Sequence, residues 1–175
     1  PSGDTLTQAM LSPLLQEGLT VRLASGYVYD FEGIYRLRAW VHLPGRQLTV
    51  LRDENGGNYI SLETYAATTG FDGLIRDADR MEHRIPLTTQ DILSVREQGL
   101  RFSVTIPAKD PGAYFVRLSV KDQGSGKIGS AYQYIEIPDL QEEGLSLSDL
   151  FTLGRNEDIR RILSNTAGES AERLY

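Results

Sequence analysis

Apolar and polar residues alternate with a period of two along several segments of the chain, as they do in strands that bury one face. The clearest segment is Leu100–Ile106, in which Leu, Phe, Val and Ile alternate with Arg, Ser and Thr. The same alternation predicts six further strands, over 19–24, 34–43, 48–52, 59–65, 114–121 and 130–137. Seven strands with short connections predict a mainly β chain that folds as a two-sheet antiparallel β-sandwich.

Three short stretches favour a helix instead. Residues 4–17 repeat apolar side chains every four positions, and within 88–98 Thr88 can cap a helix that Gly99 ends. A third helix is expected after Asn156, which can cap it. The sequence therefore predicts an N-terminal helical segment over 1–18, a β-sandwich domain over 19–153, and a C-terminal helix and tail over 154–175.

Glycine, proline and asparagine mark the expected connections. The runs 53–58 and 122–129 have hairpin composition, and Pro107 and Pro138 are expected to end the strands before them. Residues 66–84 show no sustained period, so we expect a long loop there with one irregular strand. Residues 144–148 alternate again and predict an additional edge strand.

Composition excludes several classes of function. The 175 residues carry a net charge of -6 with a sequence pI near 5.0, which argues against a surface that neutralises phosphates, so we expect no nucleic-acid partner. The chain contains no run of eighteen apolar residues, so no membrane insertion is expected. It also contains no cysteine, which excludes disulfides and cysteine-based metal sites.

Two resemblances follow from the last third of the chain. Asp110–Val116, read DPGAYFV, resembles the E–F corner of immunoglobulin domains, where a Tyr early in strand F bonds to the upstream backbone. Val116 stands where antibody domains place their second Cys. The longer stretch Gly99–Leu147 resembles the C-terminal region of the secreted von Willebrand factor A-related (VWFA-related) proteins of acidobacteria.

This second resemblance implies an immunoglobulin-like accessory domain of an exported, secreted or periplasmic bacterial protein. It also implies that an A-type domain precedes this region. The chain starts at Pro1 without a signal-type segment, which suggests a piece of something longer. The metal-adhesion motif of the A-type domain, Asp-x-Ser-x-Ser, is absent from the sequence, so the resemblance does not imply a metal site here.

Few residues suggest catalysis. His42 and His83 are the two histidines, and neither has a Ser and Asp in a pattern typical of a triad. Gly124-Ser125-Gly126 superficially suggests a nucleophile elbow, but its flanks favour the tip of a hairpin. We therefore expect no enzyme activity, no catalytic residues and no cofactor.

Two groups of oxygen and nitrogen ligands could hold a divalent metal. Asp77, Asp79, Glu82 and His83 form the first, although nearby arginines favour a solvated, charge-balanced segment. Asp53, Asn55 and Asn58 form the second, and the glycines between them favour a hairpin turn. We expect no metal site, and keep a metal-dependent enzyme or a calcium-binding domain using residues 77–83 as an alternative.

The nine tyrosines suggest a binding surface. Tyr27, Tyr29, Tyr132 and Tyr134 could form a platform on which sugars stack, although alternating aromatic residues more often fill a core. The sequence thus favours a non-enzymatic interaction or structural module that contacts a protein, with carbohydrate binding as the alternative. We also expect five side chains to be buried together, those of Phe102, Val104, Tyr114, Val116 and Leu118.

Overall fold

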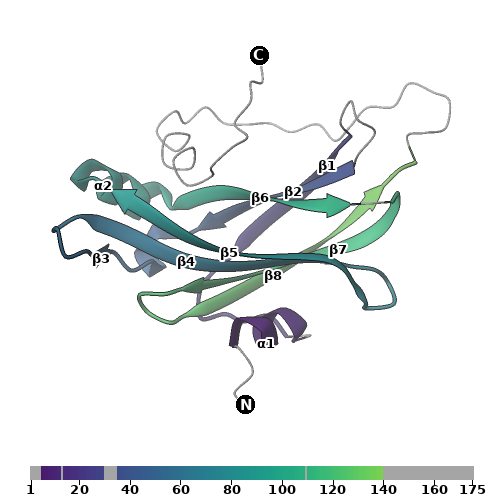
Figure 1. Cartoon of the computed structure of the whole chain (residues 1–175), viewed down its shortest axis with the longest axis horizontal. Coiled ribbons are helices and arrows are strands. Elements are labelled where there is room, and N and C mark those ends of the chain that lie inside the picture. The colour runs from purple at the N-terminus through teal and green to yellow at the C-terminus, as the bar shows by residue number, and fades with distance from the viewer. Residues whose placement is uncertain (1–4, 13, 30–34, 109, 140–175) are drawn as a thin grey trace.

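Two antiparallel β-sheets face each other in the computed structural model, which describes residues 5–12, 14–29, 35–108 and 110–139 (Figure 1). The first sheet has the order β1 (Arg22–Tyr29), β2 (Tyr35–Leu43), β6 (Leu100–Ala108). The second contains β3 (Leu51–Arg52), β4 (Asn58–Thr69), β7 (Gly112–Asp122) and β8 (Ile128–Ile137), with β5 (Ile75–Leu87) along the other side of β4. The described residues are thus mainly β, as expected. The expected strand at 144–148 and the C-terminal helix lie outside them.

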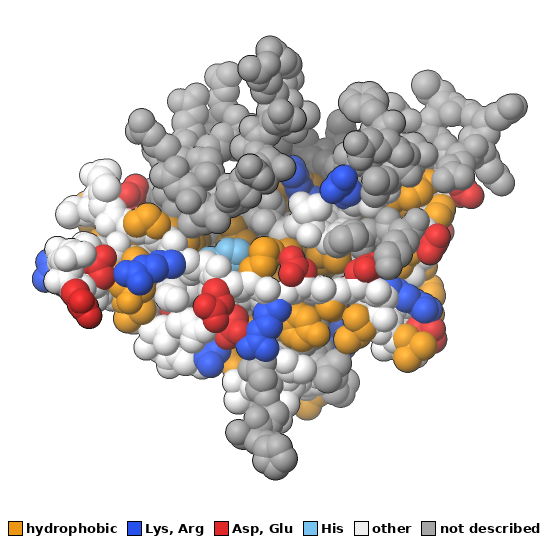
Figure 2. All heavy atoms as spheres, viewed as in Figure 1, with side chains coloured by type: hydrophobic (Ala, Val, Ile, Leu, Met, Phe, Trp, Pro, Cys, Tyr) orange, Lys and Arg blue, Asp and Glu red, His pale blue; other side chains and the backbone are white. Residues whose placement is uncertain are grey.

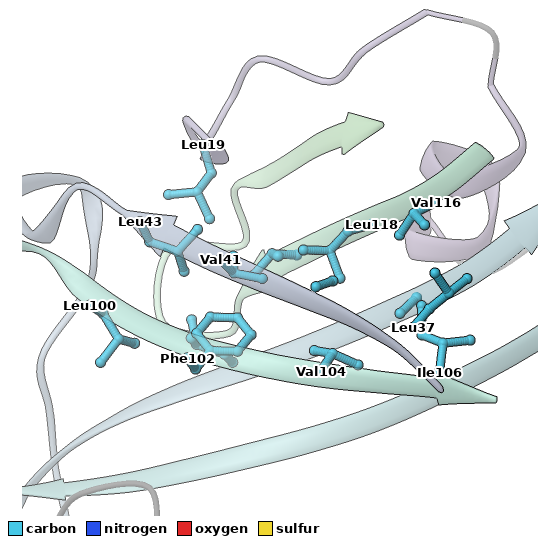
Figure 3. Close-up of a cluster of buried hydrophobic side chains, with 14 of the residues drawn as sticks. Leu19, Leu37, Val41, Leu43, Leu100, Phe102, Val104, Ile106, Val116 and Leu118 are labelled. Atoms are coloured by element: carbon cyan, nitrogen blue, oxygen red, sulfur yellow. The ribbon is translucent and has the colours of Figure 1, made fainter. Parts of the chain in front are cut away.

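The core lies between the two sheets and follows the predicted alternation. In β2 every second side chain, from Tyr35 to Leu43, is buried, and the intervening ones are exposed or half-buried. Figure 3 shows side chains of β2 and β6 pointing toward those of β7 across this space. Of the five residues expected to share the core, four are buried, and Tyr114 is half-buried against them.

A short helix, α1 (Thr5–Leu11), covers part of the outer face of the second sheet. Its Leu6 and Ala9 are buried, and it contacts β4, β7 and β8. The Arg117 Nη2 atom donates a 2.7 Å hydrogen bond to the carbonyl of Ser12 just after the helix. Because α1 lies on this face, Ala67 of β4 is buried although it points away from the core.

The prediction of a long loop over 66–84 is wrong. β4 continues to Thr69 and, after a short turn, β5 pairs with it over almost its whole length. The alternation was not visible because Ala66–Thr69 are buried on both faces and β5 exposes charged side chains on both. β5 is therefore an eighth strand, in addition to the seven expected.

Two predicted boundaries also differ. The first strand begins at Arg22 rather than at residue 19, and Leu19 instead pairs with the start of β8, where its amide donates to the Ile128 carbonyl at 3.1 Å. Pro107 does not end β6, which runs to Ala108. β6 is at an edge of its sheet, where a missing amide donor is tolerated.

The inserted helix is confirmed as α2 (Thr89–Gln98). The Thr88 hydroxyl accepts from the Asp91 amide at 3.2 Å, and the Asp91 carboxylate accepts from the Thr88 amide at 2.8 Å. This reciprocal capping box fixes the first turn. Gly99 ends the helix with a positive φ of 80°, a conformation that favours glycine. α2 packs beside the 3₁₀ turn η1 (Gly45–Gln47) at one end of the sandwich.

Candidate functional site

The two histidines lie on strands of different sheets. The Nε2 atom of His42, on β2, is 2.9 Å from the Gln98 carbonyl, and that of His83, on β5, is 3.0 Å from the Thr64 hydroxyl. The His83 ring also packs near Phe102, with ring centroids 5.8 Å apart. Each histidine ring therefore has a polar neighbour within the fold, and the fold does not bring the two histidines together.

His83 makes stability depend on pH. Its pKa is lowered from 6.5 mainly by burial, an effect that the Asp79 carboxylate opposes. A neutral ring in the fold contributes stability that is complete above the unfolded pKa of about 6.5 and is lost as the pH falls through the lower folded value. We expect His83→Gln to lose less thermal stability than the unmodified protein as the pH is lowered from about 6.5, measured by thermal melting. His42→Gln is the control, and equal losses in His83→Gln and the unmodified protein would contradict this assignment.

Ser125 belongs to a hairpin turn. Its hydroxyl donates a 2.6 Å hydrogen bond to the Asp122 carboxylate, which is buried and also accepts from the Thr49 hydroxyl at 2.7 Å. Gly126 has a positive φ of 72° in the same turn between β7 and β8. The Ser125 hydroxyl is thus used to close the turn.

The acidic cluster of β5 is spread along an extended strand. Asp77 and His83 are six residues apart, which corresponds to about 20 Å at the rise of a strand. Glu82 lies on the opposite face of β5 from Asp79 and His83, because successive side chains alternate. The fold therefore does not bring these side chains to one point.

The second predicted ligand group forms a turn. The Asp53 carboxylate accepts hydrogen bonds from the amides of Asn55, at 3.0 Å, and Gly57, at 2.7 Å. Gly56 has a positive φ of 82°, which suits the tip of the turn. Within the part of the chain that the structure describes, no three His, Asp or Glu side chains are close enough together to hold a metal ion.

The four tyrosines proposed as a platform do not lie together. Tyr27 is only 5% exposed and belongs to the core, so its predicted place in the platform is wrong. The side chain of Tyr29 is outside the described residues. Tyr132 and Tyr134 of β8 are 53% and 45% exposed on the outer face of the second sheet. These two remain candidates for a binding surface.

Two phenylalanines complete an aromatic patch around these tyrosines. The Phe115 ring, on β7, lies 6.4 Å from the Tyr132 ring and 5.7 Å from the Tyr134 ring, both edge to face. Phe71, in the turn between β4 and β5, lies 5.7 Å from Phe115 and is 73% exposed. We call Phe71, Phe115, Tyr132 and Tyr134 the aromatic patch.

Sequence reasoning missed both phenylalanines. Phe71 is followed by Asp72-Gly73, a turn dipeptide, and Gly73 has a positive φ of 74°. A large apolar residue beside such a turn is a signal in the sequence from which the exposed position of Phe71 could have been predicted. Phe115 alternates with Tyr114 and Val116, so the pattern places it on the non-core face of its strand, where it is half-buried among the other three rings.

Exposed apolar side chains concentrate near this patch. Of eight large hydrophobic side chains exposed among the described residues, five lie in β8, in the β4–β5 turn or at the first residue of β5. Figure 2 shows hydrophobic side chains around the end of the molecule where this turn lies, and mixed charges along the rest of the visible face. Single exposed hydrophobic residues are ordinary, but a cluster marks an interaction site.

A hollow of about 360 Å³ lies beside the patch and is open to solvent. Phe71, Arg76, Asp110 and Tyr114 are among its lining residues. The Tyr114 hydroxyl donates a 2.7 Å hydrogen bond to the Asp110 carbonyl, which is the upstream bond expected from the sequence. Burial and then the Asp110 carboxylate raise the pKa of Tyr114 above 10, so the phenol stays protonated and can donate.

The comparisons with known proteins add no relative. The described residues contain no helix that is long and apolar enough to cross a membrane. Searches with family models, among curated proteins and among solved structures find no significant match to this chain.

Proposed function

We propose that this domain is a non-enzymatic, immunoglobulin-like interaction module of an exported bacterial protein and that it contacts another protein through the aromatic patch. The observation that carries the proposal is the clustering of exposed rings on one face, formed by Phe71, Tyr132 and Tyr134 around Phe115. Aromatic residues are enriched at the centres of protein interfaces, where they contribute much of the binding energy.

The strand order supports the immunoglobulin-like part of the proposal. With β3 left aside, the order β1, β2, β6 matches the order A, B, E of immunoglobulin strands, and the order β4, β7, β8 matches C, F, G. β5 lies beside β4, where variable-type domains add strand C′. The bond from Tyr114 to Asp110 supports the same assignment. The resemblance to VWFA-related proteins supports export and an accessory role beside an A-type domain.

The position of the ionisable side chains favours binding over catalysis. His42 and His83 lie on different sheets, and the acidic residues of β5 are spread along the strand. The patch itself presents rings and hydroxyls rather than a nucleophile paired with a base. Such a surface can provide binding energy when its apolar rings are buried against a partner.

Carbohydrate binding is the second candidate, and one observation favours it. Tyr132 and Tyr134 are exposed and carry hydroxyls, and the Tyr134 hydroxyl lies 3.4 Å from the Glu136 carboxylate. Exposed rings beside polar groups suit the alternating apolar and polar faces of a sugar. This candidate uses the same face of the second sheet.

Site-specific photo-crosslinking in the bacterium that makes the protein tests the proposal. A photoreactive amino acid replaces Phe71 in the full-length protein, and a second strain carries it at Leu93, which is 52% exposed on α2. We expect discrete protein adducts from position 71 and none from position 93. Adding Tyr132→Ser should lower the adduct yield about tenfold, the loss expected when an interface aromatic is removed.

Two controls separate the outcomes. Tyr132→Ser should change the melting temperature by no more than about 2 °C, because the side chain is exposed. A glycan array probed with the purified protein tests the second candidate. Glycan binding that Tyr132→Ser abolishes, without adducts at position 71, would replace protein contact by carbohydrate binding, and equal adducts at both positions would contradict the patch.

A further inference from the structure

The outer face of the first sheet is rich in arginine. Side chains alternate along a strand, so Arg36 and Arg38 of β2 point away from the core. Arg22 of β1 and Arg101 of β6 lie on the same face, because each is directly opposite His42 of β2. All four arginines are exposed. We call them the basic face, and it lies on the side of the molecule away from α1 (Figure 1).

The strands of this sheet supply no carboxylate to balance the charges. The other outward side chains that the structure describes here belong to alanine, serine, threonine, tryptophan and histidine. Among the described residues, Arg22, Arg38 and Arg101 have no ion pair. The arginines of β5, in the second sheet, are each paired with a carboxylate. Those pairs are Arg76 with Asp72, Arg80 with Glu63, and Arg84 with Asp53.

The positive charges of the basic face are close enough to repel one another. Arg22 and Arg101 lie on either side of His42 in one row across the sheet, about 10 Å apart at the spacing of strands. Arg36 and Arg38 are two positions apart on β2, which is about 7 Å. Neighbouring like charges on one face of a sheet are destabilising. A bound anionic group would relieve this repulsion.

We infer that the basic face binds an extended acidic segment of a partner protein. Side chains on one side of an extended segment are also about 7 Å apart, so carboxylates at alternate positions match the spacing of Arg36 and Arg38. A guanidinium group can pair with a carboxylate through two parallel hydrogen bonds. Trp40 is half-buried on the same face, and both arginine and aromatic residues are enriched at protein interfaces.

The charge of the remaining surface favours a short acidic segment over a nucleic acid. The chain has 18 basic and 24 acidic residues, so the surface outside the basic face is more acidic than the net charge of -6 indicates. Duplex DNA carries one negative charge per about 1.7 Å of its length, so phosphates beyond the basic face would meet that acidic surface. An acidic segment of a few residues places its charges on the arginines alone.

Fluorescence anisotropy with the purified full chain tests the inference. The probe is a fluorescein-labelled peptide of alternating Glu and Ser, and the control peptide has Gln in place of each Glu. We expect the Glu peptide to bind at about 50 mM salt and to bind about tenfold more weakly at about 500 mM salt. The Gln peptide should not bind. This result does not depend on the proposed function, because the aromatic patch is on the outer face of the other sheet.

Two double variants with the same change in charge locate the binding. Arg38→Gln/Arg101→Gln should bind the Glu peptide about tenfold more weakly than the unmodified protein, since two exposed ion pairs are lost. Arg76→Gln/Arg84→Gln, on the second sheet, should bind it within about twofold of the unmodified protein. The first variant should melt within about 2 °C of the unmodified protein, because both of its arginines are exposed.

Several results would overturn the inference. They are no binding of the Glu peptide at about 1 mM protein, equal binding of the Gln peptide, and equal weakening in the two double variants. Single-stranded oligothymidine that binds as tightly as the Glu peptide would replace the acidic segment by a nucleic acid. Peptide binding that appears only in Glu142→Gln/Glu143→Gln would assign the basic face to acidic residues of the chain itself.

Discussion

Val116→Asp is expected to abolish folding. Val116 is fully buried at the centre of β7, where its side chain points toward β6 and β2 in the space between the sheets (Figure 3). Placing an unpaired carboxylate there costs roughly several kcal/mol of folding free energy, in addition to the packing contacts that the valine loses. A domain of this kind has a total stability of about 5–15 kcal/mol, so the folded state would be largely or wholly lost.

Thermal melting and solubility measure this effect, with Thr105→Asp as the matched control. Thr105 is exposed on β6 and is directly opposite Arg38 of β2, so an added carboxylate faces solvent and a cation. We expect Thr105→Asp to melt within about 2 °C of the unmodified protein. A soluble Val116→Asp protein with a cooperative melting transition would show that Val116 is not in the core.

Gly129→Ala is expected to detach the segment before β1 from β8. A Cβ atom at Gly129 would lie 1.8 Å from the Leu19 carbonyl oxygen, and a backbone atom cannot move aside as a side chain can. The substitution should therefore break the hydrogen bonds that join Gln16 and Leu19 to β8 and expose Leu19, which is 1% exposed. Loss of a buried leucine and two hydrogen bonds amounts to about 3–5 kcal/mol.

Chemical denaturation measures the loss, and Gly57→Ala serves as the control. The atoms nearest to a Cβ atom at Gly57 belong to the Asp53 carboxylate, at 2.8 Å, and this side chain can shift slightly where a backbone carbonyl cannot. The control should lose much less stability than Gly129→Ala. Equal free energies of unfolding for Gly129→Ala and the unmodified protein would contradict the pairing of residues 16–19 with β8.

The sequence predicts best those strands that have one covered and one solvated face. β2 and β6 are such strands, and their alternation corresponds to the observed burial at nearly every position. The cap at Thr88 and the stop at Gly99 were also predictable, because their side-chain and backbone chemistry is local.

The hairpin of β4 and β5 could not be predicted in this way. The end of β4 is covered on one side by the core and on the other by α1, so its residues have no solvent-exposed face. β5 is an edge strand whose charged side chains are exposed on both faces over most of its length. In each strand the alternation is missing for a tertiary reason. β4 lacks it because α1 covers its outer face, and β5 lacks it because solvent reaches both of its faces.

The candidate site was predictable only in part. Tyr132 and Tyr134 are exposed as the platform hypothesis requires, because β8 lies at the edge of its sheet and alternates cleanly. Tyr27 is equally aromatic but faces the core from β1, a choice of face that the local sequence does not determine. The contact of Phe71 with Phe115 joins a turn to a strand 44 positions later, and only the sheet register brings these two rings together.

Amide hydrogen exchange along β8 measures most directly whether this strand pairs with β7 in the observed register. In dilute solution the amides of Gln133 and Ile135, which face β7, should exchange slowly, and those of Tyr132, Tyr134 and Glu136 should exchange fast. Fast exchange at Gln133 and Ile135, or exchange at Tyr132, Tyr134 and Glu136 that is as slow as theirs, would contradict this strand register.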